Sequence, residues 1–189
     1  MIFTPGNEYA ALLDACVLVP VSLCDCLLRL AEEPAMYRPL WSDQILKEMA
    51  RALRTKLHRT SREVAWRREQ MQLAFPSAMV TFSAELLKAT ECVPDENDRH
   101  VLAAAISARA NTIVTQNIRH FPGDCLEKFG VICQTADEFL VRQYHLNPPL
   151  VLNKLDDQAA GISQDRVFVV ASLKAAAPEF CRLVGAHEL

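Results

Sequence analysis

Three acidic residues stand where an ionised side chain is unexpected. Asp14 interrupts the apolar run "ALLDACVLV" at residues 11–19, and Asp98 lies on the apolar face of the alanine-rich segment "DRHVLAAAISARA". Glu48 flanks the apolar stripe of a further predicted helix. A buried carboxylate is costly unless it is paired or bound to a cation, so these acids are candidates for one common site.

The chemistry that such a site supports is phosphodiester cleavage. Carboxylates that converge at the carboxyl edge of a parallel sheet repel one another, and a hard cation such as Mg²⁺ or Mn²⁺ removes that repulsion. Water on such a cation is a usable nucleophile near neutral pH, and the cation also stabilises charge on a phosphoryl group. Thr115 and Asn117 end or follow the apolar segment "NTIVT" and would lie at the same edge, where Asn117 could hold that water.

An alternative is that these acids only cap helices. A negative charge in the first turn is stabilised by the helix dipole, whatever else the residue does. In "VPDENDRH" we expect Asp95 to be the better-placed cap, Glu96 to face solvent and Asp98 to face inward. His100 lies about 200° round the helix from Asp98, which favours a structural role for the imidazole.

The segments that must position these residues alternate between strand and helix patterns, which predicts an α/β layered fold around a parallel sheet. The predicted strands are residues 11–19, 78–82, 111–115 and 131–134. The segment "YRPLWSDQILKEMARALRTKL" is interpreted as opening a helix with Ser42 as its N-cap. Capping-box spacing occurs in two pairs, Thr60 with Glu63 and Thr135 with Glu138.

Pro148 and Pro149 break the preceding helix and mark a boundary. We expect residues 1–146 to form the α/β domain and residues 147–189 to form a helical extension packed on or beside it. One helix of the extension is expected to begin at Pro178. The extension could complete the core, contact a second copy or dock a partner, and core completion is favoured because most apolar helical faces are packing faces.

Length and composition suit a single domain with a sizeable core, since 51% of the 189 residues are hydrophobic. No apolar run approaches the roughly 20 residues of a membrane span. The opening "MIFTPGNEYA" lacks the pattern of a signal peptide, so we expect a cytoplasmic protein without membrane contact. The seven cysteines are scattered without zinc spacing, and we expect them to be reduced and mostly buried.

The formal net charge of −3 gives no overall signature of nucleic-acid binding, but the charge is unevenly distributed. Residues 51–68, "RALRTKLHRTSREVAWRR", contain seven Lys or Arg and one acid. This stretch is either a solvated helical hairpin or a basic rim that contacts phosphates. The chain shows no motif for sequence-specific reading of DNA.

Four segments in this order resemble the PIN-domain superfamily, and within it the VapC-like toxins of toxin–antitoxin systems: "LLDACVLVP", "WSDQILKEM", "VPDENDRHVLAAA" and "IVTQNIRHFP". The resemblance covers roughly residues 8–145. It implies a three-layer α/β/α sandwich whose central parallel sheet has four to five strands, and a metal-dependent ribonuclease. It also implies that Asp14, Glu48 and Asp98 hold the Mg²⁺ or Mn²⁺, with Asn117 at a fourth position and Thr115 beside it.

Two departures from the resemblance matter. His120 stands where relatives often carry an acid, and Asn97 stands where an acid often precedes the equivalent of Asp98. One ion could then be held firmly and a second only with substrate, with His120 and Asp95 as additional site residues. An alternative is a PIN fold that binds RNA or a protein partner without cleaving RNA.

The function expected from this resemblance is that of a Mg²⁺/Mn²⁺-dependent endoribonuclease, the toxin of a type II toxin–antitoxin pair. Its partners would be RNA and a cognate antitoxin, and a homodimer stays open. The residues expected to guide the RNA backbone are Arg51, Arg54, Lys56, Arg59 and Arg99. A haloacid-dehalogenase-type phosphatase needs a second Asp where Cys16 stands, and no G-x-x-x-x-G-K motif or catalytic-cysteine setting is present.

Overall fold

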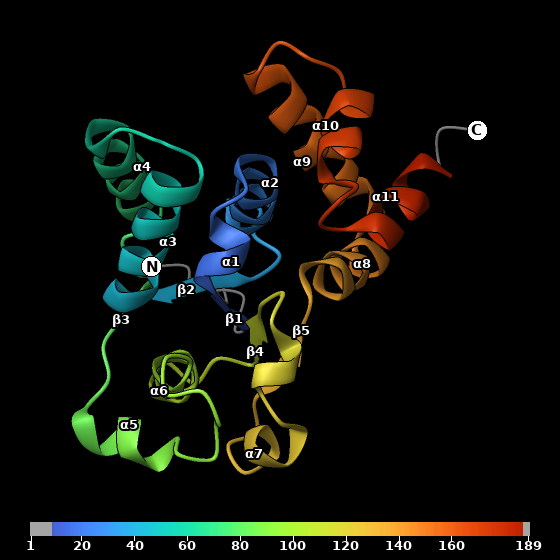
Figure 1. Cartoon of the computed structure of the whole chain (residues 1–189). Coiled ribbons are helices and arrows are strands. Elements are labelled where there is room, and N and C mark those ends of the chain that lie inside the picture. Colours follow the sequence, from blue (N-terminus) through green and yellow to red (C-terminus); the bar gives the residue numbers. More distant parts are fainter. Residues whose placement is uncertain (1–8, 187–189) are drawn as a thin grey trace, which may run out of the picture.

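The computed structural model describes residues 9–186. Within them, all strands pair in parallel in one sheet with the order β3-β2-β1-β4-β5 (Figure 1). Their bounds are β1 Ala10–Leu13, β2 Arg38–Ser42, β3 Met79–Val80, β4 Thr112–Val114 and β5 Ile132–Gln134. The predicted α/β sandwich with a parallel sheet is confirmed, and the sheet has five strands.

The strand order places the carboxyl ends of β1 and β4 side by side. From β1 the chain adds β2 and β3 on one side and then returns to add β4 and β5 on the other. Ligands of open α/β sheets bind at such a reversal, outside the carboxyl ends of the strands. Leu13 pairs with Val114, and Asp14 N donates to Val114 O at 3.1 Å, so Asp14 and Thr115 leave the sheet together.

Helices cover both faces of the sheet. Helix α6 packs across β1, β2 and β4 on one side, while α1 and α2 lie on the other (Figure 1). The bounds in the first half of the chain are α1 Ala15–Leu18, α2 Val21–Ala31, α3 Asp43–Lys56, α4 Ser61–Ala74 and α5 Ala84–Ala89. Further on they are α6 Arg99–Ser107, the 3₁₀ turn η1 Ile118–His120, α7 Gly123–Glu127 and α8 Ala136–Leu146.

Local signals placed the helix starts correctly. Ser42 accepts a hydrogen bond from Ile45 N as the N-cap of α3, and both predicted capping boxes form, at the starts of α4 and α8. The interpretation of residues 11–19 as one strand was wrong, because the strand ends at Leu13 and Asp14 caps α1. The strand β2 was also missed, since its residues were assigned to the start of the next helix.

The last three helices are α9 Pro148–Gly161, α10 Arg166–Leu173 and α11 Pro178–Gly185, which begins at Pro178 as predicted. They gather beside α2 and α8 (Figure 1). Lys154 Nζ donates to the carbonyls of Glu32 and Glu33 just after α2. The carboxylate of Asp137 on α8 accepts from the first backbone N–H groups of α11. These contacts fix the helices to the body, while the boundary at residue 146 stays a prediction.

The helices within residues 9–186 are all too short or too polar to cross a lipid bilayer. The longest of them, α3, α4 and α9, have 14 residues each. The opening segment "MIFTPGNEYA" was expected not to be a signal peptide. Its residues 1–8 lie outside the described residues.

The prediction that every cysteine is reduced was wrong. Cys92 and Cys125 form a disulfide across a sequence separation of 33. Cys24 and Cys26 are free and buried, as expected. The disulfide joins the loop before α6 to α7, so it links the segment that carries Asp98 to the segment that follows His120.

We expect the double variant Cys92→Ser/Cys125→Ser to lose about 2–4 kcal/mol of unfolding free energy, because the cross-link restricts the unfolded chain. Urea unfolding followed by circular dichroism measures the change. Reductant should lower the stability of the unmodified protein to that of the variant and leave the variant unchanged. Equal stability of both proteins without reductant would contradict the prediction.

Candidate active site

Asp14 is a buried carboxylate at the carboxyl end of β1. Its side chain is held by three donors: Ala15 N to Oδ1 at 2.6 Å, Thr115 Oγ1 to Oδ2 at 2.6 Å, and Cys16 Sγ to Oδ2 at 3.1 Å. The residue is 5% exposed. These hydrogen bonds fix the carboxylate at the edge of the sheet, and Oδ1, which accepts a single bond, keeps a lone pair for another ligand.

Cys16 shares this corner without acting as a nucleophile. Burial, and then the negative charge of Asp14, raise the pKa of the Cys16 thiol to about 12. A thiol with that pKa stays protonated near neutral pH, which suits its contacts with Asp14 and Thr115 Oγ1. Cys16 therefore serves this corner as a hydrogen-bonding neighbour of Asp14 and Thr115.

Asp98 is the N-cap residue of α6, yet its side chain does not cap the helix. Oδ2 instead lies 2.6 Å from His120 Nδ1. Burial is the largest cause of a raised pKa of the Asp98 carboxyl; the nearby His120 opposes it, and the charges of Asp95 and Asp14 add to it. The charge of Asp14 therefore acts on Asp98, although the two acids are far apart in the sequence.

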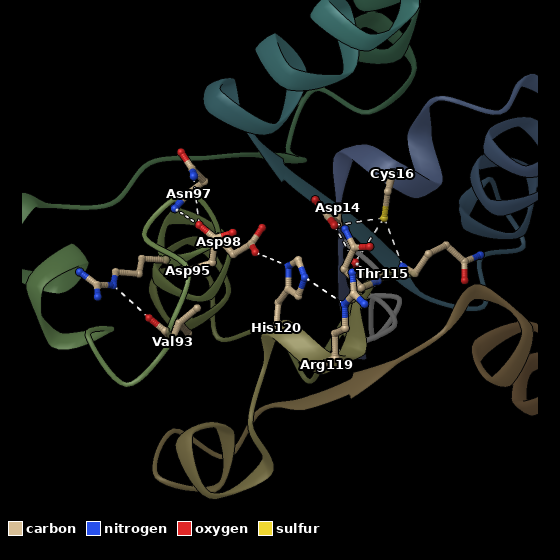
Figure 2. A network of polar contacts seen from close by, with 12 residues as sticks. Asp14, Cys16, Val93, Asp95, Asn97, Asp98, Thr115, Arg119 and His120 are labelled. Atoms are coloured by element: carbon tan, nitrogen blue, oxygen red, sulfur yellow. Dashed lines mark hydrogen bonds and ion pairs between the residues drawn. The ribbon is translucent and has the colours of Figure 1, made fainter. Parts of the chain in front are cut away.

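The hydrogen bonds of His120 define its tautomer. Arg119 Nε, which can only donate, lies 3.3 Å from His120 Nε2, so Nε2 must accept. Nδ1 then carries the proton and donates to Asp98. Figure 2 shows His120 between Asp98 on one side and Arg119 on the other. His120 thus contacts the carboxylate of Asp98, and its role as an additional site residue stays a prediction.

Asp95 does not cap α6 with its side chain, so that prediction was wrong. Its Oδ1 accepts from the backbone N of Asn97 at 2.9 Å and from the side-chain Nδ2 at 3.0 Å (Figure 2). These bonds to Asn97 are the largest cause of the lowered pKa of the Asp95 carboxyl. Glu96 is exposed as expected, and Asn97 serves to hold Asp95.

Glu48 lies on α3, and its carboxylate is fixed by His100, a residue for which the sequence predicted a structural role. Its Oε1 lies 2.8 Å from His100 Nε2, and His100 is buried at the start of α6. Within residues 9–186, the cluster of close ligand atoms contains Asp95, Asp98 and His120, whereas Glu48 and Asp14 are outside it. The structure therefore does not bring the three predicted metal-binding acids into one close group.

Thr115 and Asn117 hold the corner next to Asp14. Thr115 Oγ1 donates to Asp14 and accepts from Asn117 N at 3.1 Å. Asn117 is half-buried and precedes η1, and its side chain makes no capping bond there. Thr115 therefore fixes both the carboxylate and the turn that carries Asn117.

The predicted RNA-contacting residues divide into two groups. Four are on α3 and just after it, mostly exposed: Arg51, Arg54, Lys56 and Arg59. Arg99 is folded back instead, with Nε donating to Val93 O at 3.0 Å and Nη1 3.5 Å from Glu96. Arg99 thus stabilises the loop that carries Asp95 and Asp98.

The family model described as "PIN domain" matches residues 10–119, which is more than half of the chain. The chain belongs to the PIN domain family. This match runs from β1 into η1 and includes Asp14, Glu48, Asp95 and Asp98, and it ends one residue before His120. It confirms the family resemblance and the fold that the four sequence segments implied.

One curated relative shares a segment with this PIN domain. The protein named "Putative ribonuclease VapC50" of Mycobacterium tuberculosis (strain ATCC 25618 / H37Rv) is 49% identical over 49 residues. The match covers 26% of this chain and 29% of the relative, so the chain spans less than a third of that protein. The likeness supports a VapC-like PIN domain.

We expect Thr115→Val to lower the unfolding free energy by about 1–3 kcal/mol, because it removes one of the three donors to the buried Asp14 carboxylate and the acceptor of the Asn117 N–H. Thr115→Ser is the matched control, since it keeps the hydroxyl and removes only a methyl group. Urea unfolding of both variants measures the difference. A valine variant as stable as the serine variant would show that the hydroxyl is not needed.

Proposed function

We propose that this PIN domain is a Mg²⁺/Mn²⁺-dependent endoribonuclease. The observation that carries the proposal is the position of the Asp14 carboxylate at the carboxyl end of β1, beside the end of β4, where its charge helps to raise the pKa of Asp98 at the start of α6. Both acids lie at the reversal point of the sheet, where α/β folds place their ligands. Family membership and the name of the partial relative support the choice of a nuclease over other metal enzymes.

The residues fit a divalent cation. The raised pKa of Asp98 shows that burial and the charges of Asp95 and Asp14 outweigh the favourable effect of His120. A cation between Asp14 and Asp98 would relieve this repulsion, and the carboxylate oxygens there are the ligands that Mg²⁺ and Mn²⁺ take. When bound, the cation supplies an activated water and stabilises charge on the phosphoryl group.

The chain's own residues would position the reaction. Thr115 fixes the Asp14 carboxylate, and Asn117 offers an amide to orient a water or a phosphate oxygen. Glu48, held by His100, would add a carboxylate from α3 to this acidic wall. The exposed cations on the same helix would guide the RNA backbone toward that wall, since phosphate contacts set register without reading sequence.

We further propose that the protein is the toxin of a type II pair, with an antitoxin as partner. The name of the partial relative supports this. A second candidate is a PIN-fold protein that binds RNA or a protein partner without cleavage. It is favoured by the hydrogen bond of His120 to Asp98 Oδ2, which competes with a cation for that oxygen.

Asp98→Asn is expected to abolish metal-dependent cleavage of total RNA, because it removes the central carboxylate. Asp14→Asn should do the same. The matched control is Glu96→Gln, an acid of the same loop whose side chain is 83% exposed, and it should cleave at the parental rate. EDTA should stop cleavage and added Mn²⁺ should restore it. Equal rates for Asp98→Asn and Glu96→Gln would refute the assignment, provided that circular dichroism shows both variants folded.

The double variant Arg51→Ala/Arg54→Ala should weaken RNA binding and lower the salt dependence of log Kd by about 0.7 for each phosphate that the protein no longer neutralises. Fluorescence anisotropy with a labelled single-stranded RNA at several salt concentrations measures both effects. Arg142→Ala, which removes a cation on α8, is the control and should leave the slope unchanged. An unchanged slope in the double variant would place the RNA path elsewhere.

A further inference from the structure

A pocket with a volume of about 360 Å³ lies beside the Asp14 corner, where the PIN domain meets the C-terminal helices. We name it the base pocket, and its wall is formed by Cys16, residues 20–23, Gln116, Ser172, Ala175 and Ala176. We propose that it binds one unpaired nucleobase of the RNA and prefers a base with carbonyl oxygens. The proposal rests on the nuclease function above, and the family match ends before the last three of these residues.

Cys16 connects the base pocket to the proposed active site. Its Sγ donates to Asp14 Oδ2 at 3.1 Å and accepts from Gln116 N at 3.2 Å, so the pocket wall contacts the Asp14 carboxylate. Figure 2 shows Cys16 beside Asp14 and Thr115. A nucleotide whose phosphate lies at this corner can therefore place its base in the pocket. Proteins that read RNA sequence bind unpaired bases in this way.

The surroundings of the base pocket favour an uncharged occupant. Among the residues that the structure describes, those lining the pocket have no ionised side chain near neutral pH, since the pKa of the Cys16 thiol is raised to about 12. Burial is the largest cause of that raised pKa and the charge of Asp14 is the next, so the negative potential of Asp14 extends to the pocket wall. This potential repels the anionic phosphates of RNA and does not repel a neutral base.

The start of α2 supplies hydrogen-bond donors to the base pocket. The helix begins at Val21 with Pro20 as its N-cap, and the side chain of Pro20 cannot accept a hydrogen bond. The first N–H groups of a helix have no partner inside the helix, and residues 20–23 line the pocket in succession. These donors favour a base with carbonyl oxygens. Uracil carries a carbonyl on each side of its ring N–H, whereas adenine carries none, so we expect uracil to bind better.

The C-terminal helices hold the wall of the base pocket in place. Gln116 Nε2 donates to Ala176 O at 3.3 Å, which joins the segment after β4 to the loop after α10. Gln158 on α9 is buried, and its Nε2 donates to Ser22 O at 2.9 Å. The pocket lies near the lower end of the range of about 300–1,000 Å³ for small-molecule sites, which suits a single base. The exposed side chain of Val21 offers an apolar surface to the face of that base.

The test is fluorescence anisotropy of the full chain with labelled oligouridine and oligoadenosine of equal length, in EDTA so that no RNA is cleaved. The unmodified protein should bind oligouridine more tightly. Ser172→Trp, which places an indole in the pocket, should weaken oligouridine binding about 2- to 10-fold, the loss of about one hydrogen bond, and should remove the preference over oligoadenosine. The matched control is Ala171→Trp, which adds the same side chain at an exposed neighbouring position outside the pocket and should keep the preference.

A second measurement locates the base directly. Oligouridine that contains 4-thiouridine should form a photochemical cross-link to residues 20–23 or to the loop after α10, mapped by mass spectrometry. The cross-link should be absent from Ser172→Trp and present in Ala171→Trp. Circular dichroism of both variants checks that they are folded.

The outcomes separate the base pocket from the nuclease proposal. A preference for oligouridine that depends on Ser172, in a protein that cleaves no RNA, would support the pocket and contradict the nuclease. A protein that cleaves RNA but binds oligouridine equally well before and after Ser172→Trp would overturn the pocket and leave the nuclease standing. Equal losses in Ser172→Trp and Ala171→Trp would also overturn the pocket.

Discussion

The burial of Asp14 is the constraint on which the rest of the site depends. An isolated ionised carboxylate inside a protein costs several kcal/mol, and the cost falls only when hydrogen bonds replace water. Parallel pairing of β1 with β4 supplies them, because it places Thr115 beside Asp14 at the strand ends. The switch from strand to helix at Asp14 supplies another, through Ala15 N. Sheet topology and helix capping together therefore hold one charge at the edge of the sheet.

The negative charge of Asp14 contributes to raised pKa values of neighbouring acidic groups. Asp14 contributes to the raised pKa of Asp98, and it contributes likewise to the raised pKa of the Cys16 and Cys133 thiols, for both of which burial is the largest cause. The corner is thus anionic and repels further negative charge. His120 opposes this effect at Asp98, and it also contributes to the lowered pKa of Asp95. A phosphate of an RNA backbone could approach this anionic corner only if cations screened the repulsion. The metal and the basic residues of α3 therefore belong to the same proposal.

Local signals in the sequence predicted most of the helices and strands. The sequence did not predict the contacts between distant segments. The caps at Ser42, Thr60 and Thr135 depend on residues within one turn, so their spacing was enough. The apolar run around Asp14 hid a change from strand to helix, because both structures bury the same residue types. The contact of Glu48 with His100 and the disulfide of Cys92 join segments whose proximity only the fold determines. Asp14, Glu48 and Asp98 were predicted to share a metal site, and that assignment stays a prediction, because the close group of ligand atoms in the described residues contains Asp98 without the other two.

The alanine-rich helix α6 helps to position two acids, Glu48 on α3 and Asp98 at its own start. Its residues from His100 to Ala105 are all buried, and their side chains are mostly small, so α6 can approach the sheet closely. That approach brings His100 to Glu48, while the first turn leaves Asp98 free to meet His120. The helix dipole favours the negative charge of Asp98, yet its pKa is raised, so burial and neighbouring acids outweigh the dipole. A larger side chain in α6 would push the helix away from the sheet and separate these contacting residues. The small residues of α6 are therefore required by the site as well as by the core.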